Sequence, residues 1–248
     1  MSALVNSQLP DNLLLLDIGN SRIKFAVANS GIIGLHGVLQ QAEQLSALLA
    51  KVELCLLSAV GQQQSLVWIE STLQQQHIPY QYMQTQAELA GLQCAYKEYQ
   101  RLGVDRWLAM LACKAVCDKD FAVLDFGTAM TCDVVSHQGQ HLGGWIAPGI
   151  MTMKSGLMQR TEKLSISDTL PETLALGTNT EDCIDFGTIA TMQGFLLSAQ
   201  RYMDNFSRDY QIFVGGGDQH KLTPLLTNTI VPMEHLVFKG MLTVMKHQ

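Results

Sequence analysis

The stretch that decides the fold is Leu13-Leu-Leu-Leu-Asp17-Ile-Gly-Asn-Ser-Arg-Ile-Lys24-Phe-Ala-Val-Ala28, near the start of the chain. Its four leucines predict a buried strand, Gly19-Asn20 predicts a tight turn, and the alternating residues that follow predict a second strand. The stretch is therefore expected to form a β-hairpin with polar groups at its tip.

The same pattern occurs a second time, in Phe121-Ala-Val-Leu-Asp125-Phe-Gly-Thr-Ala-Met-Thr131-Cys-Asp133-Val-Val135. It again predicts an apolar strand, an Asp-x-Gly-Thr turn and a second strand. Helix-like segments follow both copies, as in domains that combine strands with helices. The duplication predicts an α/β fold of two similar domains that face one another across a cleft, one over residues 13–117 and the other over 118–246.

Between and after the two hairpins, the spacing of apolar residues indicates further elements. Helices are predicted at 40–49, 62–76, 107–117 and 176–198, strands at 52–60 and 211–215, and the end of a helix at 241–245. Gly143-Gly144 and Gly149 are interpreted as a loop. His137 and His141 are interpreted as loop histidines without a chemical role.

Composition narrows the possible functions. The 248 residues include 22 acidic and 16 basic side chains, a formal net charge of −6, and no long run of Lys or Arg. A surface for nucleic acid or for an anionic membrane is therefore not expected. The first residues lack the basic and apolar regions of a secretory signal, and 13–16 is too short to span a bilayer, so a cytoplasmic protein is expected.

The cysteines and histidines do not suggest a metal centre. The six cysteines form no CxxC pair, and the seven histidines do not lie at zinc-ligand spacing from them. The cysteines are interpreted as buried free thiols. Charged residues make up 15% of the chain, below the roughly 25% typical of soluble domains, which leaves apolar surface that a subunit contact could use.

The common nucleotide and hydrolase motifs are absent, since the chain contains no P-loop, GxGxxG, HExxH or GxSxG. The Asp-x-Gly turn of each hairpin offers another way to bind phosphate. Its glycine allows close approach, its N–H groups donate to phosphate oxygens, and its Asp can hold a divalent cation. Lys24 could add a positive charge, and Gly215–Gly217 supply a third glycine turn. The alternative is that each Asp only satisfies N–H groups of its own turn.

Gly103-Val-Asp105-Arg106 precedes the predicted helix 107–117. Asp105 could simply cap that helix, or it could accept the proton of a substrate hydroxyl during phosphoryl transfer. Arg106 could neutralise a substrate carboxylate or the phosphoryl group in transfer. Tyr96 and Tyr99 could be core aromatics or cleft walls, and Thr180 is expected to be a helix N-cap.

The chain resembles the type III pantothenate kinases in the order and spacing of four motifs, which are Asp17-x-Gly-Asn-Ser-x-x-Lys24, Gly103-x-Asp105-Arg106, Asp125-x-Gly-Thr-Ala129 and Gly143-Gly-x-Ile-x-Pro-Gly149. The resemblance implies the fold of acetate and sugar kinases, Hsp70 and actin, with two ribonuclease-H-like domains flanking a nucleotide-binding cleft. It also implies a homodimer. The implied reaction is phosphorylation of the 4′-hydroxyl of pantothenate by ATP, which opens coenzyme A synthesis.

The resemblance further implies roles for individual residues. Asp105 is the expected general base, Asp125 is expected to hold K⁺ or NH₄⁺, and Mg²⁺ is expected to accompany ATP. The expected ATP-binding residues are Asp17, Ile18, Gly19, Asn20, Ser21, Arg22, Ile23, Lys24 and Thr128. The expected pantothenate-binding residues are Tyr96, Gly103, Val104, Asp105, Arg106 and Thr180, with Tyr99 as the alternative to Tyr96.

Two other interpretations stay open. A kinase of the same fold could act on another small hydroxyl substrate, or a related hydrolase could act on polyphosphate, although 248 residues is short for those groups. A non-catalytic ATP-binding regulator belongs to a different class. A regulator would not need Asp105 and Arg106, so their presence argues against it.

Overall fold

The computed structural model describes residues 10–60, 63–159, 171 and 173–248. Contacts between residues divide the chain into two units. The first comprises Met1–Ala115 together with Leu236–Gln248, and the second comprises Val116–His235.

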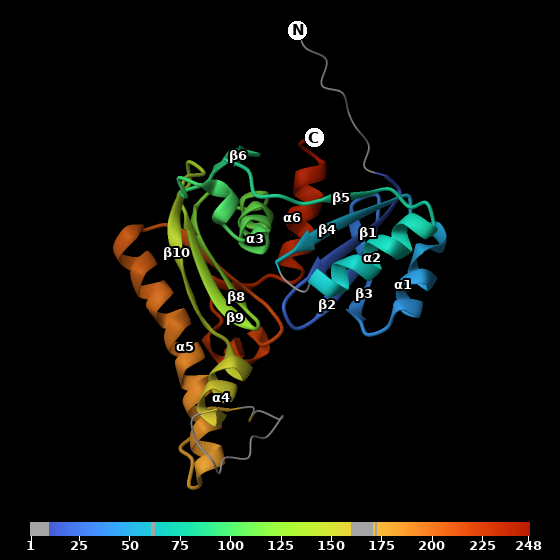
Figure 1. Ribbon diagram of the computed structural model, residues 1–248. Helices are drawn as coiled ribbons and strands as arrows, with labels where there is room; N and C mark the ends of the chain where they lie inside the picture. Colours follow the sequence, from blue (N-terminus) through green and yellow to red (C-terminus); the bar gives the residue numbers. More distant parts are fainter. Residues whose placement is uncertain (1–9, 61–62, 160–170, 172) are drawn as a thin grey trace. The chain divides into compact units, whose positions relative to one another are not determined.

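A five-stranded sheet of order β3-β2-β1-β4-β5 forms the centre of the first unit (Figure 1). Three strands pair antiparallel, namely β1 (Asn12–Ile18), β2 (Ile23–Asn29) and β3 (Ile32–Leu39). Parallel pairing extends the sheet on the other side of β1, through β4 (Leu54–Ala59) and β5 (Tyr80–Tyr82). The four leucines of β1 are fully buried, as expected for a central strand with neighbours on both faces.

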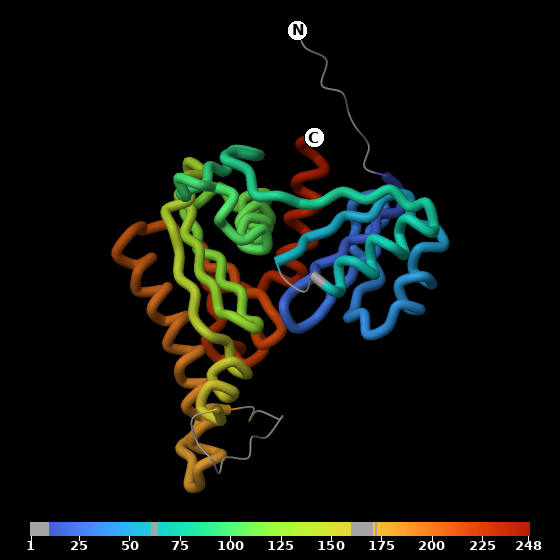
Figure 2. The backbone as a smooth tube through the Cα atoms, in the orientation of Figure 1, coloured from blue at the N-terminus to red at the C-terminus, as the bar shows by residue number. Residues whose placement is uncertain are grey.

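Helices cover both faces of this sheet. On one face, α1 (Ala42–Leu48) and α2 (Gln63–Gln75) form a single core with alternate residues of β1 and β4. On the other, α3 (Val104–Lys114) contacts β4, and α6 (Leu236–Met245) contacts β1. Figure 2 shows the C-terminal helix returning to lie beside α3. The sequence-based division placed this helix in the second domain, whereas its contacts lie in the first unit.

Short elements complete the first unit. A 3₁₀ helix, η1 (Leu49–Lys51), follows α1, and a two-stranded ribbon precedes a second 3₁₀ helix before α3. These elements are β6 (Glu88–Leu89), β7 (Leu92–Gln93) and η2 (Tyr99–Arg101).

The second unit repeats this architecture around a sheet of order β10-β9-β8-β11-β12. Its antiparallel strands are β8 (Asp120–Phe126), β9 (Ala129–Val135) and β10 (His141–Pro148). Its parallel strands, which continue from β8, are β11 (Tyr210–Gly215) and β12 (Ile230–Pro232). The two sheets have the same order and the same strand directions, which confirms the expected duplication within an α/β fold.

One long helix, α5 (Thr180–Phe206), covers one face of the second sheet. The core there also includes residues of α4 (Ile150–Met158) and of the 3₁₀ helix η3 (Gln219–Leu225). α4 lies alongside the first half of α5 (Figure 1). Among the described helices, none combines the length and apolar character needed to cross a lipid bilayer.

Three sequence-based expectations about this chain were wrong. Gly143-Gly144 lies inside β10 rather than in a loop, because a β-bulge after His141 lets Gly143 adopt a φ of +116°. His141 is a buried strand residue whose Nε2 lies 3.0 Å from Asp133 Oδ1. The cysteines are all free thiols, but Cys183 is exposed and Cys94 is only partly buried.

Candidate active site

Three polar side chains lie in a row at the carboxyl ends of β1 and β4. Asp17 is paired with Lys24 across β1 and β2, and with Ser58 across β1 and β4. Paired side chains point to the same face of a sheet, here the face opposite the core that contains Leu16 and Ile18. Ligands of α/β sheets bind beyond the carboxyl ends of parallel strands, so this row occupies the usual position of a ligand site.

The turn between β1 and β2 presents polar groups to solvent. The Gly19 N–H donates to the Arg22 carbonyl at 3.1 Å and closes the turn, while Asn20, Ser21 and Arg22 are exposed. Such a turn beside a carboxylate suits a phosphate group that carries a cation. Ile18 and Ile23, which were also expected to bind ATP, have their side chains in the core, so only their backbone groups remain for a ligand.

The second hairpin repeats this arrangement with different neighbours. Asp125 is paired with Thr131 across β8 and β9, and with Gly215 across β8 and β11. A Cβ atom added to Gly216 would lie 2.5 Å from Asp125 Oδ1, so the carboxylate packs against the third glycine turn. Gly216 has a φ of +96°, which side chains other than hydrogen disfavour. The Asp-x-Gly-Thr turn and the Gly215–Gly217 turn therefore meet at Asp125.

The first turn of α4 supports the second Asp-x-Gly turn. The Gly149 N–H and the Thr152 hydroxyl both donate to the Thr128 carbonyl, at 3.0 and 2.7 Å. A side chain on Gly149 would collide with the backbone of Gly127 and Thr128, so this close approach requires glycine. The side chain of Thr128 is itself exposed, as a ligand-binding residue must be.

Asp105 lies in the first turn of α3, which begins and ends earlier than the predicted range 107–117. Its carboxylate folds back on the helix start, where Oδ1 accepts a hydrogen bond from the Arg106 N–H at 2.9 Å. The same oxygen would lie 2.5 Å from a Cβ atom on Gly103. Asp105 is half-buried. One carboxylate oxygen is thus hydrogen-bonded at the start of the helix, while Asp105 stays partly exposed.

Arg106 is a buried cation held by Tyr96. The residue is 6% exposed, its Nη1 donates to the Tyr96 hydroxyl at 3.1 Å, and its guanidinium carbon lies 5.9 Å from the Tyr96 ring centre. The negative face of the ring and the hydroxyl both favour the charged guanidinium. These contacts favour Tyr96 over Tyr99 as the tyrosine beside the Gly103–Arg106 motif. Tyr96 also borders a surface groove of about 380 Å³ with Lys97, Glu98 and Arg101.

Thr180 begins α5 and is exposed. The cap position expected for Thr180 belongs to Asn179, whose Oδ1 accepts from the Asp182 N–H at 2.8 Å. In Figure 1 the amino end of α5 lies beyond α4, away from the second sheet. Within the second unit, Thr180 is therefore not brought next to Thr128.

Residues 13–200 match the family model of type III pantothenate kinase. The chain belongs to this family. Type III pantothenate kinases from Pseudoalteromonas atlantica and Teredinibacter turnerae are each 35% identical to it, over 237 and 249 aligned residues. Both alignments cover 93% of this chain, and they cover 96% and 97% of the two relatives. The likeness therefore extends over both sheets and over the start of α3.

Solved structures confirm the fold class of this kinase. A Baf family protein from Campylobacter jejuni, named as a transcriptional activator, has a TM-score of 0.62 at 23% identity and covers 94% of this chain, with 97% of its own length aligned. The activator of 2-hydroxyisocaproyl-CoA dehydratase from Clostridium difficile, solved with ADPNP, has a TM-score of 0.50 at 8% identity. That alignment covers 95% of this chain and 93% of the activator. At these identities the likeness shows the fold alone. That fold is the actin-like pair of ribonuclease-H-like domains.

One polar residue of the kinase, Ser58, was not predicted from the sequence. Its side chain is fully buried, and its hydroxyl has no hydrogen-bond partner among the residues that the structure describes. A buried hydroxyl without a partner costs about 1–3 kcal/mol. The sequence signal was a serine near the end of the strand 52–60, but only the pairing of β4 with β1 brings it beside Asp17.

The carboxylates of the two hairpins suit cations that arrive with a ligand. Over the described ranges, no group of three or more His, Cys, Asp or Glu side chains is placed to hold a metal ion. Mg²⁺ in kinases is commonly held by one or two carboxylates together with phosphate oxygens and water. Asp17, between Lys24 and Ser58, and Asp125, against Gly216, each place a single carboxylate near the tip of a hairpin.

Proposed function

We propose that this kinase transfers the γ-phosphoryl group of ATP to the 4′-hydroxyl of pantothenate in the cytoplasm, with Asp105 as the general base. The observation that carries the proposal is the position of the Asp105 carboxylate, half-buried at the start of α3 and next to the buried Arg106. A carboxylate so placed can accept a hydroxyl proton. The adjacent guanidinium can offset the negative charge of the transferring phosphoryl group or of a substrate carboxylate.

In the proposed reaction, the 4′-oxygen bonds to the γ-phosphorus as its proton moves to a carboxylate oxygen of Asp105. The bond between the γ-phosphorus and the bridging oxygen breaks, and ADP leaves with the electron pair of that bond. The hydrogen bond from the Arg106 N–H, at 2.9 Å, holds the carboxylate in one orientation. Asp105 then loses the proton to solvent.

ATP is bound in this proposal by the tip of the first hairpin, residues 17–24, and by Thr128. N–H groups of the exposed turn donate to phosphate oxygens, and Lys24 supplies a point charge. The buried side chains of Ile18 and Ile23 limit these two residues to backbone contacts. Mg²⁺ bound with ATP would neutralise the phosphate charge, with Asp17 available as its carboxylate ligand.

Pantothenate is bound in this proposal by residues at the start of α3 and by Tyr96 and Thr180. Tyr96 is supported by its 3.1 Å hydrogen bond from Arg106 and by its partly exposed ring. Gly103 and Val104 would contribute backbone groups, because Gly103 lacks a side chain and the side chain of Val104 is buried.

A monovalent cation, K⁺ or NH₄⁺, is assigned to Asp125. The support is a single carboxylate whose paired neighbours are a hydroxyl and a glycine rather than a second acid. A single negative charge with neutral oxygen groups suits a large monovalent cation. Asp125→Asn is expected to abolish any preference for potassium over sodium in the rate. Asp120→Asn, at the other end of the same strand, is the control and should keep that preference.

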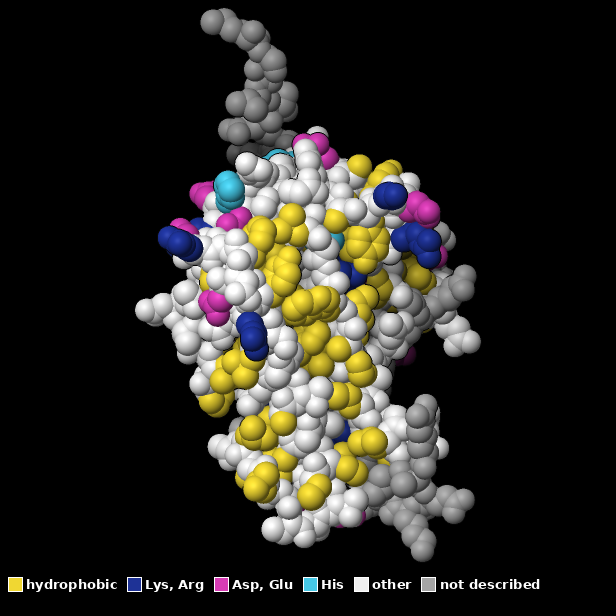
Figure 3. Space-filling view, turned by 90° about the vertical axis from the view of Figure 1, so that its left-hand side faces the viewer, with side chains coloured by type: hydrophobic (Ala, Val, Ile, Leu, Met, Phe, Trp, Pro, Cys, Tyr) yellow, Lys and Arg dark blue, Asp and Glu magenta, His cyan; other side chains and the backbone are white. Residues whose placement is uncertain are grey.

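We also propose a homodimer, and one face of the second unit suits the contact. The edge strand β10 exposes Trp145 and Ile146, and α5 exposes Tyr202. The rings of Trp145 and Tyr202 meet edge to face, 5.9 Å between centres. Hydrophobic side chains gather on this face of the molecule (Figure 3). A second copy would remove from water both the apolar surface and the open strand edge.

Sedimentation tests the dimer. Wild-type protein is expected to sediment as a dimer, and Ile146→Lys as a monomer, since Ile146 is 64% exposed on β10. Ile32→Lys is the matched control, because Ile32 is 74% exposed on the edge strand of the other sheet. A wild-type chain that is monomeric at micromolar concentration would exclude the dimer.

The function itself is tested by ADP release from Mg²⁺-ATP with and without pantothenate, in potassium and in sodium buffers. Release that depends on pantothenate and is faster in potassium is the expected result. Release that is independent of pantothenate would indicate another acceptor. No release under any condition would instead favour a regulatory ATP-binding protein.

A further inference from the structure

A buried ion pair joins α4 to α5. Lys154 Nζ lies 2.6 Å from Asp185 Oδ1, and the two residues are 0% and 7% exposed. Moving two charges out of water carries a large penalty, and apolar residues of similar volume often give equal or greater stability. Stability alone therefore does not explain why this contact is ionic.

α4 is anchored at its amino end to the second Asp-x-Gly turn. There Gly149 and Thr152 donate to the Thr128 carbonyl, and Ile150 enters the core of the second sheet. Lys154 follows Ile150 by one helical turn, so both side chains lie on the same face of α4. These two are the buried residues of the helix.

α5 is anchored to the second sheet by its C-terminal half. Its core residues on the second sheet begin at Met192, whereas Asp185 belongs to the earlier part of the helix, which runs alongside α4 (Figure 1). Thr180, in the first turn of α5, precedes Asp185 and lies farther from the sheet. The position of Thr180 relative to the Thr128 turn therefore depends on how α4 and α5 are joined near Lys154 and Asp185.

We propose that Lys154 and Asp185 are positioning residues that fix Thr180 relative to Thr128. A buried polar contact can specify the register of two helices, whereas apolar contacts tolerate small shifts. The pair acts through the helices rather than on a substrate. This inference rests on the proposed roles of Thr180 in binding pantothenate and of Thr128 in binding ATP.

The decisive variant replaces both charges, Lys154→Met together with Asp185→Leu. It keeps the side-chain volume near that of the native pair, so its Tm is expected to equal or exceed that of the wild type. The KM for pantothenate is expected to rise about tenfold, while the KM for ATP changes less than about twofold, because α4 stays anchored at Thr128. A double variant with the wild-type KM for pantothenate would overturn the proposal.

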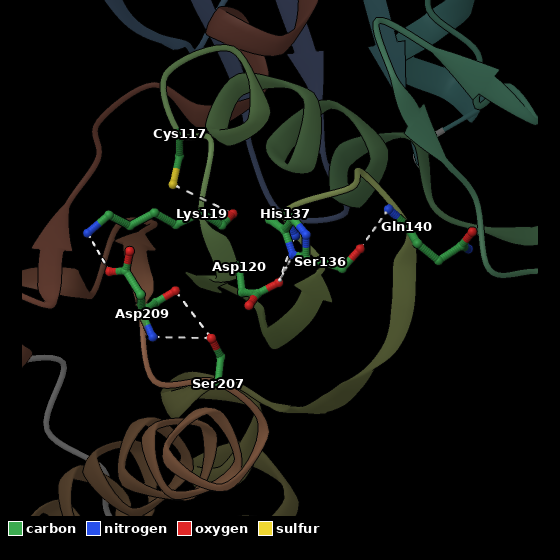
Figure 4. Close-up of polar contacts among 8 residues, drawn as sticks. All are labelled: Cys117, Lys119, Asp120, Ser136, His137, Gln140, Ser207 and Asp209. Atoms are coloured by element: carbon green, nitrogen blue, oxygen red, sulfur yellow. Dashed lines mark hydrogen bonds and ion pairs between the residues drawn. The ribbon is translucent and has the colours of Figure 1, made fainter.

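A second variant, Asp185→Glu, keeps the ion pair and lengthens it by one methylene. Its Tm is expected to stay close to the wild-type value, with a rise of about threefold in the KM for pantothenate. Unchanged kinetics would contradict a positioning role. The control is Lys119→Met, which removes the exposed ion pair between Lys119 and Asp209 elsewhere in the second unit (Figure 4). This control should change neither Tm nor KM measurably.

Hydrogen exchange provides a readout that does not need catalysis. In the double variant, the amides of Asp182 and Cys183 in the first turn of α5 should exchange faster than in the wild type, while those of α5 beyond Met192 should not change. Equal exchange in both proteins would also overturn the proposal. If the wild type does not phosphorylate pantothenate, the proposed function fails, and this exchange comparison still tests the ion pair.

Discussion

Asp17 and Asp125 occupy the same position in two sheets of identical strand order. Each is the next-to-last residue of the central strand, with one antiparallel and one parallel partner. Asp17 has the charged partner Lys24, whereas Asp125 has the neutral partner Thr131. A lysine beside a carboxylate suits a phosphate with its divalent cation, and a neutral hydroxyl suits a lone cation. The duplicated hairpin thus places different partners beside the same carboxylate, which supports the proposed binding of Mg²⁺-ATP at Asp17 and of a monovalent cation at Asp125.

Replacing Asp105 tests the general base. Asp105→Asn retains an oxygen that can accept from the Arg106 N–H, so the fold and the KM for pantothenate are expected to change little. The amide cannot take a hydroxyl proton, and kcat should fall about 10²–10⁴-fold. Steady-state kinetics beside Asp118→Asn, which removes an exposed carboxylate, provide the comparison. Near-normal kcat in the folded variant would rule out Asp105 as the base.

Ser58→Ala tests whether the Ser58 hydroxyl contributes to the site rather than to folding. Because its buried hydroxyl has no partner among the described residues, Ser58→Ala should leave the free energy of unfolding equal or raise it by up to about 1 kcal/mol. The KM for ATP is expected to rise, because the cation proposed at Asp17 would supply this hydroxyl with its missing partner. Chemical denaturation and kinetics on the same preparation separate the two effects. A marked loss of stability would show that the hydroxyl has a structural partner.

The third glycine turn offers a matched pair of substitutions. Gly216→Ala forces a side chain against Asp125 and the Phe126 carbonyl at a φ of +96°, so it should cost about 1–3 kcal/mol of stability. A Cβ atom added to Gly217 would lie in open space. Gly217→Ala should therefore change stability by less than about 0.5 kcal/mol. Thermal unfolding of the two variants provides the measurement. Equal losses would mean that the turn is not packed against Asp125.

A pH effect is expected at the amino end of β8. Burial raises the pKa of Asp120, but hydrogen bonds from Ser207 and from the backbone and ring of His137 outweigh it and hold the pKa below its usual value. Figure 4 shows the two bonds from His137. A carboxyl whose pKa is lower in the folded state stabilises the protein above its unfolded pKa of about 3.9. That stabilisation is lost as the pH falls through the folded pKa.

Asp120→Asn removes this contribution. The free energy of unfolding of the wild type should therefore fall more steeply than that of the variant between about pH 5 and pH 3. Urea denaturation at a series of pH values measures both curves, and Asp118→Asn controls for the loss of one negative charge. Parallel curves for wild type and Asp120→Asn would contradict the lowered pKa.

Local patterns carried most of what could be predicted about the fold. The leucines of β1 and the apolar run of β8 predict buried strands because side-chain alternation and burial are properties of a few consecutive residues. The loop predicted at Gly143-Gly144 was wrong, although a glycine pair is typical of loops. Its place in β10 depends on pairing with β9 through a bulge, which no local pattern shows.

Contacts between distant segments were not predictable in this way. The end of a helix was predicted at 241–245, but nothing in residues 236–245 indicates that this helix packs against α3, because that contact depends on the shape of both helices after folding. The ion pair between Lys154 and Asp185 and the pairing of Ser58 with Asp17 are of the same kind. Each joins residues that lie far apart along the chain.

The sequence by itself determined the duplicated hairpin, the α/β class, the family and the residues expected to act, because these depend on short motifs and their order. Tertiary structure decided which groups stand beside those residues: Tyr96 against Arg106, Gly216 against Asp125, and α4 against the Thr128 turn. The physical reason is that hydrogen bonds and close contacts act over a few ångströms. Only the folded chain brings such groups within that range.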